Sequence, residues 1–136
     1  MIGGIIITHA KLGEELLNVL ELIAGKQENF HIISITSPDK VDEAREEIER
    51  VIKEADQGKG VLIFTDMFGG TPSNLSLSFL DESRLEVITG VNIPMLLKFV
   101  DSRHEKGFKE LANLVMEYGR KNISVASDRL YRDKEK

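Results

Sequence analysis

The sequence predicts an α/β fold with a mostly parallel, open sheet and helices on both faces. Short apolar, β-branched runs alternate along the chain with segments of helical spacing. This alternation is typical of parallel strands, because each strand must reach its neighbour through a crossover connection that is usually a helix. The length of 136 residues, of which 41% are hydrophobic and 30% charged, fits one domain over 1–136 that can bury a core.

The first half of the chain contains two of these strand–helix units. Residues 2–8 form a continuous apolar run, the pattern of a strand that is buried on both faces. An apolar stripe with helical spacing follows and ends at Gly25, which suits the position after a helix. The stripe consists of Leu12, Leu16, Val19, Leu20 and Ile23. We expect a second strand over 30–35 and an amphipathic helix over 41–55.

The second half repeats the alternation. In order, we expect a strand over 61–65, a helix over 72–80, a strand over 85–89, helices over 94–100 and 109–118, and a short last strand over 123–126. Residues 128–136 form a charged tail that we expect to fray, with Leu130 and Tyr131 able to dock.

Two polar residues stand where predicted strands end. In parallel sheets, ligands bind beyond the carboxyl ends of the strands, where the strand order reverses. With the strand order 2-1-3-4, the reversal lies between the strands that end in His9 and Asp66, so we expect these side chains to meet. The alternatives are an exposed loop histidine without a role, and an aspartate that only caps a helix or forms a turn.

The stretch Asp66-Met67-Phe68-Gly69-Gly70-Thr71-Pro72-Ser73-Asn74 predicts a turn that enters a helix. Gly69 and Gly70 can adopt positive φ, Thr71 is expected as the N-cap, and Pro72 suits the first helical position. The free amides of such a helix start form a natural anion site, so Gly70, Thr71 and Ser73 are candidates to hold phosphate oxygens. Thr71, Ser73 and Asn74 can equally be ordinary cap and first-turn residues.

A histidine beside a carboxylate and an anion site indicates transient phosphate chemistry. An imidazole is nucleophilic near neutral pH, and a carboxylate bonded to one ring nitrogen leaves the other free to attack. Several other chemistries fit poorly. The spacing of a P-loop and of a dinucleotide-binding loop is missing, no acidic pair of a receiver domain follows the first strand, and too few ligands converge for zinc.

Composition excludes further classes of function. The formal net charge is −5 and no basic stripe is present, which argues against nucleic acid as a partner. Cysteine is absent, so disulfides and thiol catalysis are excluded. The apolar run at the N-terminus is too short for a signal peptide or a membrane span, and a cytoplasmic location is therefore the default expectation.

The chain resembles the IIA component of mannose-family (mannose/fructose/sorbose) phosphoenolpyruvate-dependent sugar phosphotransferase systems. The resemblance covers nearly the whole length, and its specific parts are Thr8-His9 with the THxxxG pattern and the DxFGGTPxN stretch that begins at Asp66. It implies that His9 takes a phosphoryl group on Nε2 from the carrier protein HPr and passes it to a IIB domain. Asp66 would bind the other ring nitrogen, while Gly70, Thr71 and Ser73 would hold the phosphoryl oxygens.

The resemblance implies further properties of the chain. It would be a separate IIA phosphocarrier domain without metal or cofactor, in contact with the membrane only indirectly through IIC and IID components. Family members are dimers that exchange the last, antiparallel strand, here Ile123 to Ala126. One departure is Ala10, where many relatives have glycine.

Two other readings of the sequence stay open. The chain could be the related phosphocarrier subunit of a dihydroxyacetone kinase, or a regulatory, anion-binding module that does not turn over. For a carrier, the docking surface around His9 is expected to be apolar with a charged rim. The candidates for it are Met67, Phe68 and the segment from Pro94 to Phe99.

Overall fold

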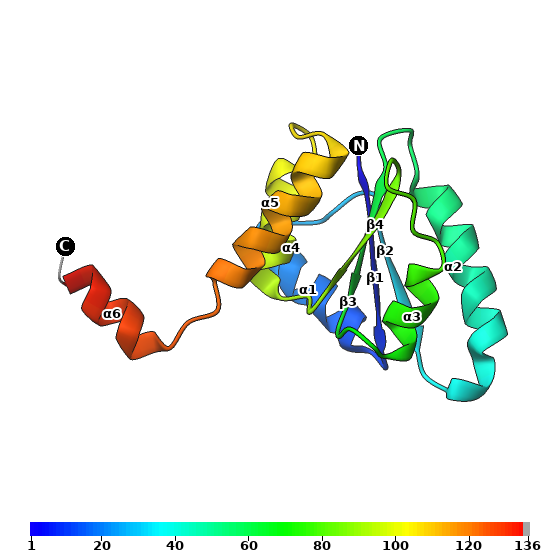
Figure 1. Cartoon of the computed structure of the whole chain (residues 1–136), viewed down its shortest axis with the longest axis horizontal. Helices are drawn as coiled ribbons and strands as arrows, with labels where there is room; N and C mark the ends of the chain where they lie inside the picture. Colours follow the sequence, from blue (N-terminus) through cyan, green and yellow to red (C-terminus); the bar gives the residue numbers. More distant parts are fainter. Residues whose placement is uncertain (135–136) are drawn as a thin grey trace.

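The computed structural model describes residues 1–134 as one α/β unit with an extended C-terminal arm (Figure 1). Its first half contains β1 (Gly3–His9), α1 (Leu12–Ala24), β2 (Phe30–Ile35), the short 3-10 helix η1 (Pro38–Lys40) and α2 (Val41–Ala55). Its second half contains β3 (Val61–Thr65), α3 (Thr71–Leu77), β4 (Leu85–Thr89), α4 (Ile93–Ser102), α5 (Phe108–Lys121) and α6 (Ala126–Lys134).

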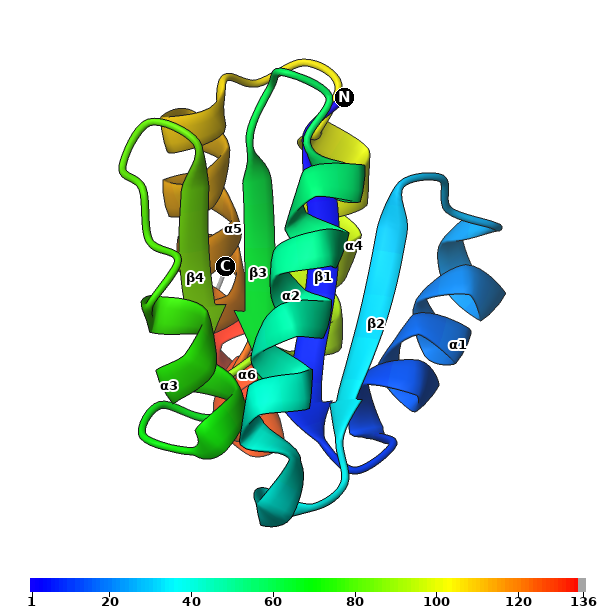
Figure 2. The same ribbon diagram turned by 90° about the vertical axis from the view of Figure 1, so that its right-hand side faces the viewer.

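The four strands form one parallel sheet in the order β2-β1-β3-β4, which confirms the predicted order. Helices α1, α4 and α5 cover one face of the sheet, and α2 and α3 cover the other (Figures 1 and 2). Alternate residues of a strand point to opposite faces, so Ile6 and Phe64 pack under the first group of helices while Ile5 and Ile63 pack under the second. All four of these side chains are fully buried.

Helix α1 is less buried than its apolar stripe predicts. Leu20 is fully buried, but Leu12, Val19 and Ile23 are 47%, 39% and 59% exposed. The sheet extends only as far as β2 on this side, so one flank of α1 contacts the core and the other faces outward. The spacing of apolar residues correctly predicted the helix and its end at Gly25, where φ is +87°. It could not predict which residues of the stripe pack against the core.

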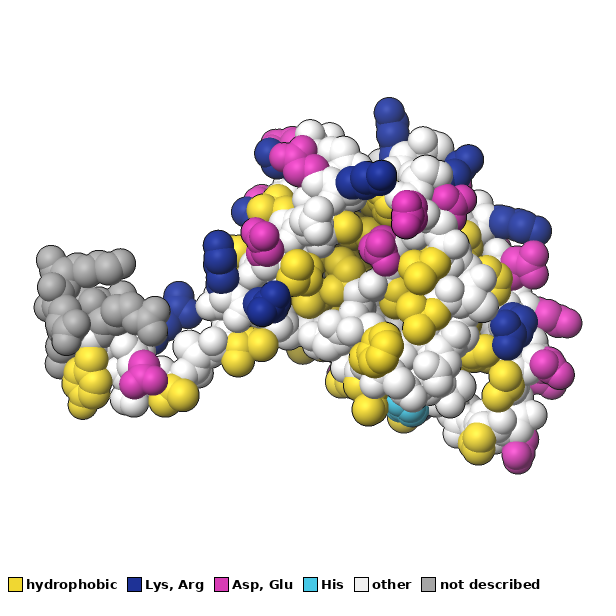
Figure 3. Space-filling model, viewed as in Figure 1, with side chains coloured by type: hydrophobic (Ala, Val, Ile, Leu, Met, Phe, Trp, Pro, Cys, Tyr) yellow, Lys and Arg dark blue, Asp and Glu magenta, His cyan; other side chains and the backbone are white. Residues whose placement is uncertain are grey.

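The C-terminal segment differs from the prediction. Residues 123–125 belong to no strand of the sheet, and helix α6 begins at Ala126, where the chain was expected to form a last strand and then a fraying tail. This segment projects from the body and carries exposed hydrophobic side chains (Figures 1 and 3). Ile123, Val125 and Leu130 are 74%, 65% and 62% exposed. The expectation that Leu130 could dock is therefore not met within the described chain. Residues 135 and 136 of the predicted tail lie outside the described residues.

Candidate active site

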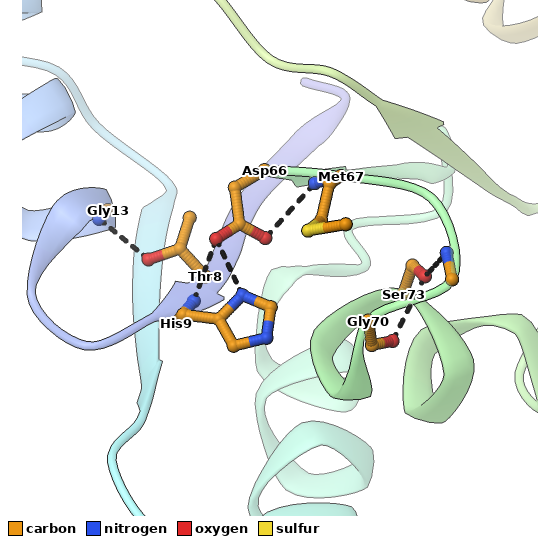
Figure 4. Close-up of polar contacts among 8 residues, drawn as sticks. Thr8, His9, Gly13, Asp66, Met67, Gly70 and Ser73 are labelled. Atoms are coloured by element: carbon orange, nitrogen blue, oxygen red, sulfur yellow. Dashed lines mark hydrogen bonds and ion pairs between the residues drawn. The ribbon is translucent and has the colours of Figure 1, made fainter.

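The candidate site lies where β1 and β3 end side by side at the carboxyl edge of the sheet. His9 is the last residue of β1, and Asp66 directly follows β3. The Nδ1 atom of His9 lies 2.8 Å from Oδ2 of Asp66, and the backbone amide of His9 donates to the same oxygen at 3.0 Å (Figure 4). The predicted meeting of the two side chains is therefore present in the structure.

This contact determines which ring nitrogen is free. Partial burial raises the pKa of Asp66, but hydrogen bonds from the ring and the amide of His9 outweigh it, so that the pKa lies below its ordinary value. An ionised carboxylate can only accept a hydrogen bond, so Nδ1 carries the proton of a neutral His9 ring. The lone pair is then on Nε2. Because the His9 side chain is 48% exposed and that of Asp66 only 14%, the imidazole is open to an incoming group while its partner is shielded.

Gly69 and Gly70 are glycine for different structural reasons, one for its backbone conformation and the other for the space beside it. Gly69 has φ of +90°, which other residues rarely adopt. Gly70 has φ of −85°, so this glycine does not use the positive φ that is open to it. A Cβ atom on Gly70 would lie 2.6 Å from Cε1 and 3.2 Å from Nε2 of His9. The backbone of Gly70 therefore forms a wall of the space in front of the free ring nitrogen.

The start of α3 also differs from the prediction. Thr71 is the first helical residue and not the N-cap; Gly70 holds the N-cap position, and no side chain caps this helix. Ser73 is fully buried, and its hydroxyl accepts from the amide of Gly69 at 2.9 Å and donates to the carbonyl of Gly70 at 3.1 Å (Figure 4). Ser73 thus stabilises the turn through hydrogen bonds to its backbone. The sequence spacing could not distinguish this role from direct contact with a phosphate.

The surface beside His9 is partly apolar. Met67 and Phe68 are 54% and 70% exposed, as expected for a docking surface. The second candidate for this surface, the segment from Pro94 to Phe99, is instead largely core, because Leu96 and Phe99 are fully buried. Spacing alone could not separate an apolar helix that covers a site from one that packs beneath the sheet.

In the sequence, Thr8 is the polar neighbour of His9 and the first residue of the THxxxG pattern, and no role was predicted for it. Its side chain is fully buried, and Oγ1 accepts a hydrogen bond from the amide of Gly13 at 2.8 Å (Figure 4). The available signal was a polar residue at the end of an otherwise apolar strand, with a glycine five residues later at the start of the next helix. That spacing allows a strand-end hydroxyl to meet a free helix-start amide.

The other histidines lie away from this edge of the sheet or make no contact with the site. His31 bonds through Nε2 to Oδ1 of Asn29 at 3.0 Å, and burial lowers its pKa. His104 is exposed in the connection between α4 and α5. Within residues 1–134, no group of three or more histidine, aspartate or glutamate side chains is arranged to hold a metal ion. Over the same residues, the helices are too short or too polar to cross a membrane.

Comparisons with known sequences and structures point to one protein family. The family model described as "PTS system fructose IIA component" matches residues 3–116. The mannose-specific EIIAB component of Escherichia coli (strain K12) is 36% identical over 120 residues, which are 87% of this chain and 37% of that protein. The chain thus spans little more than a third of the length of this relative.

Two other relatives align over most of both chains. The fructose-specific EIIA component of Bacillus subtilis (strain 168) is 28% identical over 131 residues, which cover 96% of this chain and 90% of that protein. The crystal structure of phosphotransferase system component EIIA from Streptococcus agalactiae superimposes with a TM-score of 0.85 at 30% identity. It covers 94% of this chain and 99% of that one.

Proposed function

The chain belongs to the IIA component family of mannose-type sugar phosphotransferase systems, and we propose that it carries the phosphoryl group on Nε2 of His9. As a member of this family it is a phosphotransferase component that serves sugar uptake. The proposal that a single domain over 1–136 performs this step rests above all on one observation. His9 is half exposed, and its Nδ1 atom is held at 2.8 Å by a shielded carboxylate.

The transfer is in-line displacement at phosphorus. Nε2 of His9 forms a bond to the phosphorus atom while the bond from phosphorus to the donor histidine breaks, and the electron pair of that bond returns to the donor ring. The proton on Nδ1 stays hydrogen-bonded to Asp66, which offsets the positive charge that the attacking ring acquires. Positioning and charge stabilisation account for the chemistry, and no metal or cofactor takes part in this proposal.

The phosphoryl oxygens are proposed to contact the backbone amides at Gly70 and Thr71. Amides in the first turn of a helix lack an intrahelical acceptor, and Gly70 lies against the His9 ring. Ser73 supports them indirectly, since its hydroxyl bonds to the amide of Gly69 and the carbonyl of Gly70. These donors offset the repulsion between the phosphoryl group and the carboxylate of Asp66.

We propose phospho-HPr as the donor and a IIB domain as the acceptor, with membrane contact only through IIC and IID components. The relative from Escherichia coli is named an EIIAB component, which associates a IIA unit with a IIB unit in that protein. The exposed side chains of Met67 and Phe68 beside His9 offer an apolar contact for both partners. A carrier between these two partners would act in the cytoplasm, and we propose that location for the chain.

The test is phosphotransfer from phosphoenolpyruvate through enzyme I and HPr to the wild type, His9→Ala and His104→Ala. Intact mass counts the phosphoryl groups, and acid lability identifies phosphohistidine. We expect one acid-labile phosphoryl group on the wild type and on His104→Ala, which loses an exposed histidine elsewhere, and none on His9→Ala. An unlabelled wild type with a competent donor would overturn the proposal in favour of an anion-binding module.

We also propose that the chain forms a homodimer in which residues 123–126 of each copy extend the sheet of the other. In the described chain, β4 pairs with β3 on one side, and on its other side only Leu85 is bridged, by Asp81, so that the rest of this edge is open. A groove of about 480 Å³ runs along β4 and α5, lined among others by Val87, Phe108 and Met116. Figure 3 shows hydrophobic side chains in this region with charged side chains around it.

Residues 123–126, called the arm below, have the apolar alternation of a strand but pair with no strand of the described chain. Ile123 and Val125 are two residues apart and both exposed, so in an extended conformation they point to the same side. Sedimentation of the wild type, of Ile123→Asp with Val125→Asp, and of Leu22→Asp tests the assembly. We expect a dimer for the wild type and for Leu22→Asp, whose substituted residue is 86% exposed on α1, and a monomer for the arm variant. A monomeric wild type, or a dimeric arm variant, would contradict strand exchange.

A further inference from the structure

The two strand ends that supply the site have the same local sequence pattern, a threonine followed by the polar site residue. Thr8 precedes His9 at the end of β1, and Thr65 precedes Asp66 at the end of β3. Both threonines are fully buried. Their hydroxyl groups differ: Oγ1 of Thr8 accepts from the amide of Gly13, whereas Oγ1 of Thr65 has no hydrogen-bond partner among the described residues.

The amide of Gly13 depends on this hydroxyl. Gly13 is the second residue of α1, a position whose amide is usually capped by the N-cap side chain. The N-cap here is Lys11, which makes no side-chain cap bond, so Thr8 performs the capping from the preceding strand. A Cβ atom on Gly13 would approach both Oγ1 of Thr8 and Cγ2 of Ile6 to 3.2 Å, tighter than ordinary contact. The absence of a side chain on Gly13 lets the helix start close over the strand end.

This bond closes a short loop whose first residue is His9. Ala10 has φ of +50°, a left-handed conformation that costs a residue with a Cβ atom free energy, so the surrounding bonds must hold it. The amide of Ala10 donates to the carbonyl of Ile35 at 2.9 Å, and the amide of His9 donates to Asp66 at 3.0 Å. Together with the bond from Gly13 to Thr8, these fix the backbone on both sides of the His9 ring.

We propose that Thr8 is a positioning residue for phosphoryl transfer, acting through Gly13 to hold the backbone of His9. The inference rests on the proposed function of His9 and adds a residue that touches neither the ring nor the transferred group. Without the hydroxyl, the buried amide of Gly13 is unsatisfied, α1 starts further from β1, and Ala10 relaxes out of the left-handed conformation. The ring then loses its alignment with Asp66 and with the space in front of Gly70.

The experiment compares Thr8→Val, Thr8→Ser and Thr65→Val. Valine has nearly the shape of threonine without the hydroxyl, and serine keeps the hydroxyl. Thr65→Val is the matched control, because it is the same change at the same depth and also directly precedes a site residue. Transfer from phospho-HPr is measured as kcat and KM, and the ¹⁵N signals of the His9 ring are recorded on the unphosphorylated proteins.

For Thr8→Val we expect kcat to fall by about tenfold with KM unchanged, since misplacing a reacting group slows transfer without weakening docking. The ¹⁵N signals should show loss of the single Nδ1-protonated form of the wild type. Thr8→Ser and Thr65→Val should stay within about twofold of the wild-type kcat. Wild-type values for Thr8→Val, or an equal fall for Thr65→Val, would overturn the proposal.

A second variant, Gly13→Ala, tests the same bond if Thr8→Val does not fold. If Thr8→Val does not fold, Gly13→Ala keeps the hydroxyl but pushes it away, and it should lower kcat by about threefold with the same change in the ring signals. Wild-type kcat and ring signals for a folded Gly13→Ala would overturn the proposal. If the wild type accepts no phosphoryl group, the proposed function fails, while the ring signals of the variants still decide whether Thr8 positions His9.

Discussion

The two ends of the parallel sheet are built in opposite ways. At the amino end, the buried guanidinium of Arg103 donates to the carbonyl oxygens of Ile2, Glu28 and Asn29 at 2.7 to 3.0 Å and lies 4.8 Å from the ring centroid of Phe99. At the carboxyl end, the His9 side chain is 48% exposed. The amino end of the sheet is thus held by buried hydrogen bonds, whereas the carboxyl end exposes the histidine that we propose to be phosphorylated.

The difference separates stability from chemistry along each strand. Arg103 is 2% exposed, and burial lowers its pKa to about 10, so that it remains charged at neutral pH. Its bonds join the start of β1, the approach to β2 and the end of α4, segments far apart in the sequence. We therefore expect substitutions at the amino end to change the free energy of unfolding, and substitutions at the carboxyl end to change the rate of transfer.

Arg103→Met is expected to have the largest effect on stability. The variant removes the guanidinium from three carbonyl groups, of which that of Asn29 keeps a bond from the amide of Gly4, and we expect a loss of about 3 kcal/mol in the free energy of unfolding. Urea unfolding measures it. Arg50→Met removes an exposed ion pair with Glu54 and should cost less than about 1 kcal/mol. A slower transfer by fully folded Arg103→Met would break the separation between the two ends.

Asp66→Asn is expected to have the largest effect on the rate. The amide keeps the shape of the carboxylate but not its charge, so the positive charge that the ring acquires as Nε2 bonds to phosphorus is less stabilised, and transfer should slow by about 100-fold. The matched control is Asp56→Asn. Asp56 lies near the other end of β3 and forms an ion pair with Arg84. Transfer by Asp56→Asn should equal that of the wild type; a comparable fall would show that the effect is not specific to the site.

The same two carboxylates predict how stability depends on pH. Burial raises the pKa of each, but hydrogen bonds outweigh it, and both lie below the ordinary value of 3.8. Because the folded pKa is depressed, each contributes stability that is present above about pH 4 and is lost as the pH falls through the folded pKa. Acid unfolding of either Asn variant should therefore depend less on pH below about pH 4 than that of the wild type. An unchanged dependence in Asp66→Asn would indicate that the contact with His9 does not persist in solution.

The sequence predicted the parts of this arrangement that follow from strand ends. The strand order and the meeting of His9 with Asp66 are consequences of alternation and of where β1 and β3 stop. The bonds of Arg103 could not be predicted, since its acceptors are backbone carbonyls that carry no sequence signal. Residues 123–125 show the other limit, because their apolar alternation predicted a strand, and in the described chain they pair with no strand of the sheet.

Gly70→Ala tests the carboxyl end through shape alone. The new Cβ would lie 2.6 Å from Cε1 of His9, so the ring must turn away from its position beside Asp66, and transfer should slow by about tenfold. Gly107→Ala is the matched control, because Gly107 is also an N-cap glycine in an extended conformation, and a Cβ atom added there would meet open space. We expect wild-type transfer for Gly107→Ala. An equal fall in both variants would mean that N-cap flexibility matters and the wall in front of Nε2 does not.

Ala10→Gly and Asn29→Gly compare the two ends at the smallest scale, since both residues have φ near +50°. Glycine at position 10 removes the left-handed cost of a Cβ atom but gains freedom in the unfolded chain, so we expect a net stabilisation of less than about 1 kcal/mol. At the amino end, Asn29 also donates to the carbonyl of Ala55 and bonds to His31, and Asn29→Gly should destabilise by about 1 to 2 kcal/mol.

Transfer by Ala10→Gly should stay within about twofold of the wild type, because the amides of His9, residue 10 and Gly13 keep their acceptors. Urea unfolding and transfer kinetics measure both quantities; a destabilised Ala10→Gly would mean that the left-handed conformation carries no strain, and the asymmetry between the two ends would not extend to their turns.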